Sequence, residues 1–143
     1  EVGRAAMQKM KLDDAMKGVA ASLAEVKSAG KVGIVGYCWG GTVSGKSASG
    51  VDGLSCAIAY YGGGIPGLIG EKPKVPVMFH WGETDQSIPL DKAKEVAAAH
   101  KDQQHFFYPA GHGFNCDQRG SYNAESSKQA KTRSLEFLRK HVG

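Results

Sequence analysis

The sequence has few cysteines, no long apolar run and no block of like charges. Its three cysteines, Cys38, Cys56 and Cys116, form no C-x-x-C pair, so neither a zinc site nor a disulfide framework is indicated. Free thiols in a chain of this length favour a reducing, cytoplasmic setting. No apolar stretch approaches the length of a membrane span, so no membrane partner is expected. The 18 basic and 14 acidic residues are scattered, so no nucleic-acid-binding arm is indicated.

The length and composition are typical of one globular domain. A chain of 143 residues is one domain by the usual length prior. A chain of this size buries roughly two-thirds of its unfolded surface, enough for a real core. The net charge of +4 is compatible with plain solubility, and a mild positive field could also attract an anionic substrate.

Apolar patterning predicts strands that alternate with helices. An apolar stripe at helical spacing predicts a helix over 13–28, which Gly30 ends. Short apolar runs bounded by glycine or proline predict the strands, and the remaining periodic segments predict two more helices. The strands are expected at 32–37, 56–60, 75–80 and 105–108, and the further helices at 90–100 and 123–141. Such alternation indicates an α/β fold with a mostly parallel sheet flanked by helices.

A glycine-rich segment directly after the first strand contains a candidate nucleophile. Gly36-Tyr37-Cys38-Trp39-Gly40 has the pattern G-x-C-x-G, a nucleophile elbow with cysteine in place of serine. A sharp strand-to-helix turn needs residues without bulk two places before and after the nucleophile. The turn places the Cys38 sulfur near a helix N-terminus, which favours thiolate. The Trp39 N–H would then point at a developing oxyanion. The alternative is a buried structural cysteine.

An overlapping motif favours a different class of protein. Residues 40–47, Gly-Gly-Thr-Val-Ser-Gly-Lys-Ser, match the P-loop pattern of nucleotide-binding proteins. A P-loop needs a helix that starts near its lysine, Lys46, whereas residues 50–53 end any helix almost at once. A Walker-B strand that ends in aspartate is also missing. We therefore regard Lys46 as a lysine on a helix surface and the P-loop nucleotide binder as the less favoured interpretation.

Two further residues complete a candidate catalytic triad. Asp85 follows the third strand, and His112 follows the fourth between two glycines. Taken singly, Asp85 could cap the next helix and His112 could be a surface histidine. The order nucleophile, acid, histidine, each at the C-terminal end of a strand, is that of α/β-hydrolases. The sequence therefore predicts a triad of Cys38, Asp85 and His112.

These motifs resemble the dienelactone hydrolase (carboxymethylenebutenolidase) family. The resemblance rests on residues 36–41, 82–85 and 110–114, extends to 59–62, and covers roughly 10–143. The cysteine elbow is its specific part, because most α/β-hydrolases use serine. The resemblance implies hydrolysis of the lactone ring of a dienelactone to maleylacetate, a step in aromatic degradation, with no metal and no organic cofactor.

The resemblance also assigns roles to individual residues. It implies that Cys38 attacks the lactone carbonyl, that His112 acts as base, and that Asp85 orients the imidazole. Trp39 would donate one oxyanion-hole N–H. We take Tyr37, Trp81 and Phe114 as candidate substrate-binding residues. A general carboxylesterase or thioesterase that uses the same triad is the main alternative.

The family's domain also has an N-terminal portion that is not found here. That portion supplies the first strands, a second oxyanion donor, an acidic residue that contacts the cysteine and an arginine for the substrate carboxylate. Some members carry a further arginine four residues after the histidine, where this sequence has Cys116. We therefore expect residues 1–143 to be a partial α/β-hydrolase domain whose strand at 32–37 leaves an apolar edge unpaired. Such a chain would dimerise, aggregate or retain an N-terminal fragment, and would be a feeble enzyme alone.

Overall fold

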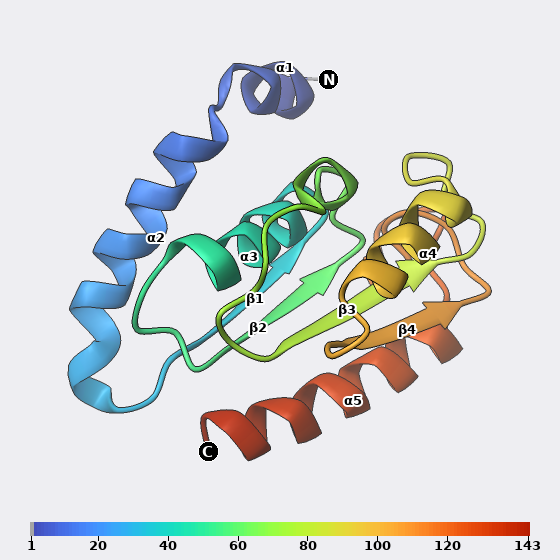
Figure 1. Cartoon of the computed structure of the whole chain (residues 1–143). Helices are drawn as coiled ribbons and strands as arrows, with labels where there is room; N and C mark the ends of the chain where they lie inside the picture. Colours follow the sequence, from blue (N-terminus) through green and yellow to red (C-terminus); the bar gives the residue numbers. More distant parts are fainter. Residues whose placement is uncertain (1) are drawn as a thin grey trace.

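Four parallel strands form the centre of the structure, a computed structural model that describes residues 2–143 (Figure 1). Their order across the sheet is β1-β2-β3-β4, and each neighbouring pair is parallel. The strands are β1 (Gly33–Tyr37), β2 (Cys56–Tyr60), β3 (Val77–Gly82) and β4 (Gln104–Tyr108). Because parallel neighbours need crossover connections, helices lie on both faces of the sheet. The predicted α/β class is confirmed.

The helices form a layer on each side of this sheet. Helix α5 runs along one face, α3 and α4 lie on the other, and α2 packs on the outer side of α3 (Figure 1). The bounds are α1 (Val2–Lys9), α2 (Leu12–Val26), α3 (Trp39–Gly50), α4 (Leu90–Ala99) and α5 (Ala124–His141), with short 3₁₀ turns η1 (Lys27–Ala29) and η2 (Ile65–Leu68). The carboxyl ends of all four strands therefore lie at one edge of the sheet, where the site is built.

Element boundaries differ from the sequence prediction in a few places. Strand β3 begins two residues later than expected, at Val77, and continues to Gly82, which pairs with Tyr108. The proline before it has no N–H to donate, so regular pairing starts after it. Helix α1 was not predicted, because eight residues carry too short a pattern to be distinguished. The helix predicted at 13–28 is observed at 12–26, and Gly30 follows with a φ of 129°.

A buried polar chain fastens α5 to the sheet. Arg133 donates to the Tyr108 hydroxyl at 3.0 Å, and that hydroxyl lies 2.9 Å from Nδ1 of His80. The other ring nitrogen of His80 lies 2.9 Å from Ser134 Oγ, which in turn lies 2.8 Å from the Tyr60 hydroxyl. Burial lowers the pKa of His80 to about 3, so its ring is neutral at ordinary pH. These bonds satisfy polar groups that would otherwise be costly to bury.

Strand β1 forms one edge of the sheet and exposes apolar side chains. Val35 and Tyr37 on β1 are 39% and 48% exposed, whereas every residue of the neighbouring strand β2 is buried. Among residues 2–143, no further strand pairs with the outer side of β1. The predicted apolar edge is therefore present in the structure.

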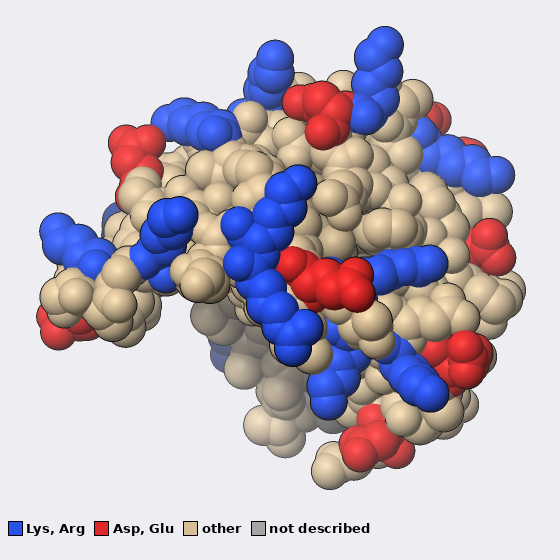
Figure 2. All heavy atoms as spheres, turned by 90° about the horizontal axis from the view of Figure 1, so that it is seen from below, with Lys and Arg blue, Asp and Glu red and all other residues tan. Residues whose placement is uncertain are grey.

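The surface of the α5 side carries charges of both signs. Figure 2 shows Lys and Arg side chains interspersed with Asp and Glu side chains over this face. Over residues 2–143, the structure contains no helix that combines the length and apolar character needed to cross a membrane.

Candidate active site

Cys38 lies on a strained turn between β1 and α3. Its backbone has a φ of 58° and a ψ of −119°, and α3 begins at the next residue. Its N–H still pairs with the Tyr60 carbonyl at 3.0 Å, which extends the register of β1 and β2 by one residue. A non-glycine residue with positive φ is uncommon and marks a position held by its surroundings. The sulfur is half-buried, at the N-terminus of a twelve-residue helix.

The glycines that the turn needs are only partly those expected from the sequence. A Cβ at Gly36 would lie 1.8 Å from the Gly40 carbonyl oxygen, so bulk is excluded there. A Cβ at Gly40 would meet nothing within 4 Å, and the prediction that Gly40 must lack a side chain is wrong. The second restricted position is Gly41, where a Cβ would lie 2.3 Å from the Tyr60 carbonyl oxygen. Close packing of α3 on the end of β2 imposes this requirement.

The structure brings Cys38, His112 and Asp85 into one line. The Cys38 sulfur lies 3.0 Å from Nε2 of His112, and Nδ1 of His112 lies 2.8 Å from Oδ2 of Asp85. An ionised carboxylate only accepts, so in the neutral imidazole Nδ1 carries the proton and Nε2 is free to accept one from the thiol. These distances fall within the range for a nucleophile, its base and an orienting acid.

Asp85 is held in place by the backbone that follows it. Its Oδ1 accepts hydrogen bonds from the N–H groups of Ser87 at 2.7 Å and Ile88 at 3.0 Å, which leaves Oδ2 for His112. The Asp85 side chain is 1% exposed, whereas Asp117, the other aspartate near the histidine in sequence, is exposed. The histidine therefore pairs with Asp85 and not with Asp117.

The environment of His112 stabilises its protonated form. The hydrogen bond that His112 donates to Asp85 is the main cause that raises the pKa of His112 to about 8; desolvation opposes this shift, and Cys38 supports it. A raised pKa strengthens the imidazole as a base toward the thiol. It also keeps a positive charge beside any thiolate that forms.

Two residues that the sequence analysis did not assign to the site support His112. Ser121 donates a 2.6 Å hydrogen bond to the His112 carbonyl oxygen from the loop before α5. The Tyr61 ring lies 5.2 Å from the imidazole, centroid to centroid. Tyr61 and Cys38 are the two non-glycine residues of the described chain with positive φ, and they follow adjacent strands. Neither Ser121 nor Tyr61 could be assigned to the site from local sequence patterns.

A hollow of about 560 Å³ opens in front of the sulfur. Its lining includes Cys38, Trp39 and His112. Arg119 also lines it, and the Arg119 side chain packs against Gly113. The rest of its lining comes from Gly3, Met7, Thr42, Gly63, Gly64 and Ser87. Arg119 brings a charged side chain to this lining, and the sequence analysis missed it. Helix α1 contributes Gly3 and Met7, so it covers one side of the hollow.

The proposed substrate-binding aromatics do not line this hollow. Trp81 is 1% exposed and stacks on Phe79 with a centroid distance of 5.7 Å, so no ligand can reach it. Phe114 is fully buried beneath Tyr61. Both assignments are therefore wrong, because these side chains fill the core on the two faces of the sheet. Tyr37 is exposed, but it points to the α5 face and packs on Tyr60 at the sheet edge.

The P-loop motif adopts a structure that cannot cradle a phosphate. Residues 40–47 lie within helix α3, and from Thr42 onward their N–H groups are used in helical hydrogen bonds, so these residues form no phosphate-binding loop. Lys46 forms an ion pair with Glu71 on the segment after η2. The helix ends at Gly50, as predicted. Lys46 thus anchors this segment to α3.

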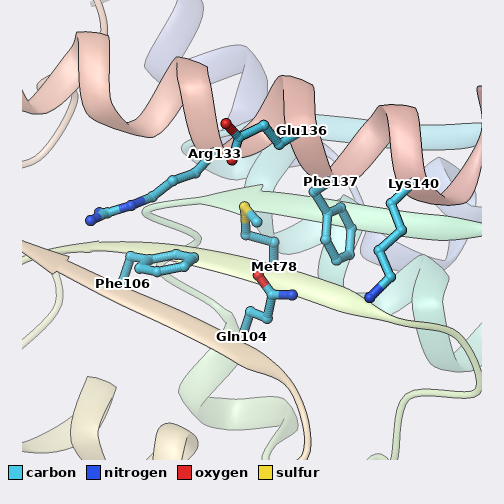
Figure 3. A pocket seen from close by; sticks show the side chains of 7 residues that line it. All are labelled: Met78, Gln104, Phe106, Arg133, Glu136, Phe137 and Lys140. Carbon is cyan, nitrogen blue, oxygen red and sulfur yellow. The ribbon is translucent and has the colours of Figure 1, made fainter.

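A smaller hollow of about 190 Å³ lies away from the triad, between α5 and strands β3 and β4 (Figure 3). Arg133 reaches from α5 over the ring of Phe106, 4.3 Å from its centroid. The other lining residues are Met78, Gln104, Glu136, Phe137 and Lys140. Arg133 also donates a hydrogen bond in the buried polar chain that fastens α5 to the sheet. We therefore attribute this hollow to the packing of α5.

The described part of the chain, residues 2–143, brings together no group of three or more His, Cys, Asp or Glu side chains that could hold a metal ion. The triad itself places one sulfur, one imidazole and one carboxylate in a row, with the carboxylate bound to the ring and to backbone N–H groups. This arrangement fits proton transfer along the row.

Solved structures share this fold. A Klebsiella pneumoniae subsp. pneumoniae protein with the provisional name dienelactone hydrolase is 25% identical, with a TM-score of 0.80 over 92% of this chain and 63% of its own. An esterase of Pyrococcus furiosus has a TM-score of 0.75 at 15% identity, covering 94% of this chain and 65% of its own. The second likeness shows the fold alone.

Sequence relatives point to one family. Carboxymethylenebutenolidase of Pseudomonas putida is 33% identical over 118 residues, which cover 78% of this chain and 49% of the relative. The chain thus spans about half the length of the curated relatives it matches. The model of the dienelactone hydrolase family matches residues 2–142, nearly the whole chain. With the strand order and the cysteine elbow already described, this match leads to one conclusion: the chain belongs to the dienelactone hydrolase family.

Proposed function

We propose that this chain carries the catalytic triad of a hydrolase of small esters or lactones, with the lactone ring of a dienelactone as substrate and maleylacetate as product. The observation that carries the proposal is the row Asp85–His112–Cys38, with separations of 2.8 and 3.0 Å. Family membership supports the same reaction class.

The reaction begins with a proton transfer within the triad. His112 accepts the Cys38 thiol proton at Nε2, and the thiolate attacks the ester carbonyl. The tetrahedral intermediate collapses, the ring C–O bond breaks, and the enolate formed takes the proton from His112 while the acyl group stays on sulfur. The neutral His112 then takes a proton from water, which attacks the thioester. The C–S bond breaks, the acid is released, and the Cys38 thiolate recovers a proton from His112. Throughout, Asp85 stabilises the imidazolium and keeps its ring oriented.

The developing negative charge needs hydrogen-bond donors in place before reaction. The Trp39 N–H is the first of helix α3 and lies directly after the nucleophile, the position from which an elbow donates to an oxyanion. The helix N-terminus adds a partial positive charge.

The lining of the hollow supports an anionic substrate. Arg119 contributes a guanidinium to the same lining as Cys38 and His112. A guanidinium binds a carboxylate through two parallel hydrogen bonds. A lactone that carries a carboxylate would therefore be oriented with its carbonyl toward the sulfur. The alternative, a general carboxylesterase or thioesterase, would show no preference for a charged substrate.

The test is ester hydrolysis by matched cysteine variants. Cys38→Ala should remove nearly all turnover of a p-nitrophenyl ester and of a dienelactone, while Cys116→Ala should keep most of it. A mechanism-based ester should label Cys38 by mass spectrometry. Labelling of Cys56 or Cys116 in its place would overturn the assignment.

A further inference from the structure

A cysteine at the elbow has chemistry that a serine there would lack. The thiolate is the reactive form of cysteine toward peroxides, and reactivity follows thiolate character and access. At Cys38 a base that can take the thiol proton lies 3.0 Å from the sulfur, and a hollow of about 560 Å³ opens in front of it. The three cysteines of the chain therefore differ in exposure to oxidants.

Cys56 and Cys116 lack the surroundings of Cys38. Cys56 is fully buried on β2, and burial raises the pKa of its thiol, so it is shielded and mostly protonated. Cys116 is half-buried in the loop after His112 and does not line the hollow. Among the described residues, Cys38 is the cysteine whose sulfur lies within hydrogen-bond distance of a histidine ring.

We propose that Cys38 is a modification site for hydroperoxides, which convert it to a sulfenic acid and switch the site off reversibly. The inference rests on the Cys38–His112 geometry and does not require that the site hydrolyse an ester. It assigns the hollow a second class of ligand, small hydroperoxides, and makes the site sensitive to oxidants.

The oxidation step balances with the groups present and one hydroperoxide. After the thiol proton moves to Nε2 of His112, the thiolate attacks one peroxide oxygen and the O–O bond breaks. A sulfur–oxygen bond forms, and the departing hydroxide (an alkoxide when the hydroperoxide is organic) takes the proton from His112 and leaves as water (or an alcohol). Sulfur loses two electrons, and the peroxide gains them. An external thiol restores the enzyme by displacing water to form a mixed disulfide, which a second thiol reduces.

His112 and Asp85 act in this step as they do in a proton relay. His112 first removes the thiol proton and then protonates the leaving oxygen. Without such an acid, departure of the unprotonated oxygen makes cleavage of the O–O bond slow. Asp85 supports the imidazolium from 2.8 Å. Loss of the Asp85 carboxylate should therefore slow the oxidation, whereas a change at Cys116 should not.

The experiment measures sulfenic acid directly on the full chain. The protein is treated with hydrogen peroxide, trapped with dimedone and mapped by mass spectrometry, with a parallel sample reduced by dithiothreitol before trapping. We expect the label at Cys38, at a rate at least tenfold above that at Cys116, and its disappearance after reduction. Cys116→Ser should leave the labelling rate unchanged, and Asp85→Asn should lower it about tenfold.

The outcomes separate this inference from the proposed function. Equal labelling of Cys38 and Cys116, or labelling unaffected by Asp85→Asn, would overturn it, as would oxidation that dithiothreitol cannot reverse. Circular dichroism on each variant shows whether it is folded, so a loss of label through misfolding is recognised. Cys38→Ser, which lacks the thiol, must lose the label. Ester hydrolysis is not a readout of this experiment, so a chain without esterase activity can still satisfy or fail it.

Discussion

The Cys38 sulfur lies 3.0 Å from Nε2 of His112, although 74 residues separate them in the sequence. Strands β1 and β4, which precede these two residues, occupy opposite edges of the sheet. The contact forms because the loop after β4 returns across the carboxyl ends of the strands. Most of the expected behaviour of this protein depends on that loop and on the turn that presents the sulfur.

The turn around Cys38 should tolerate a methyl group at one glycine and not at two others. We expect Gly36→Ala and Gly41→Ala to destabilise the fold by about 4 kcal/mol or more, because each new Cβ would overlap a backbone oxygen. Gly40→Ala, where the new Cβ meets nothing within 4 Å, is the matched control and should leave the melting temperature unchanged or slightly higher. Thermal unfolding measures all three. Equal destabilisation by Gly40→Ala would show that the packing of α3 is described wrongly.

Asp85 should be essential to turnover in a way that Asp117 is not. Asp85→Asn keeps an acceptor for the Ser87 and Ile88 N–H groups but no longer favours the histidine tautomer that the reaction needs. We expect kcat to fall on the order of 10³–10⁴-fold with little change in stability. Asp117→Asn, at an exposed position in the neighbouring loop, should retain full activity. Comparable losses in the two variants would contradict the arrangement of the triad.

The pH dependence of the reaction should report His112. Its pKa is raised to about 8, mainly by the hydrogen bond that it donates to Asp85. Below that pH the imidazole already holds a proton and cannot accept one from the thiol, so kcat/KM should fall as the pH drops through about 8. In Asp85→Asn the residual activity should have its midpoint at lower pH, because the main cause of the raised pKa is removed. A midpoint that stays near 8 in this variant would assign the titration to another group.

Arg119 should distinguish anionic from neutral substrates. We expect Arg119→Gln to lower kcat/KM about tenfold for an ester that carries a carboxylate, because one exposed charge-assisted contact is worth about 1.4 kcal/mol. Hydrolysis of a neutral p-nitrophenyl ester should not change. Arg139→Gln, an exposed arginine near the end of α5, serves as the control for net charge. A parallel loss with both esters would mean that Arg119 supports the loop and not the substrate.

The edge strand should cause the chain alone to self-associate. Val35 and Tyr37 are exposed beside an unpaired strand edge, which is a template for pairing with another chain. We expect sedimentation to show dimers or larger species, and Val35→Lys to reduce them by placing a charge on this edge. Ile69→Lys, which changes an equally exposed apolar residue away from the sheet, should have no effect. Monomers at all concentrations would contradict this expectation.

The sequence by itself determined the order of the strands and of the helices other than α1, the elbow, and the order of Cys38, Asp85 and His112. These features are local, because apolar periodicity, glycine positions and the order of motifs can each be identified within a short segment of the sequence. The position of β3 was shifted by two residues, because its pairing with β4 extends it to Gly82.

Only the tertiary structure decided which neighbours each side chain meets. Trp81 precedes Asp85 closely in the sequence, and Phe114 follows His112 closely, yet both side chains are buried in the core. The alternation of side chains along β3 directs Trp81 into the core, and the path of the loop after β4 directs Phe114 there. Arg119 and Ser121 lie seven and nine residues after His112, and the loop folds back to bring them to it. Gly41 proved restrictive and Gly40 did not, because only Gly41 faces the end of β2. Contacts between segments depend on how the layers pack, and no single segment of the sequence carries that information.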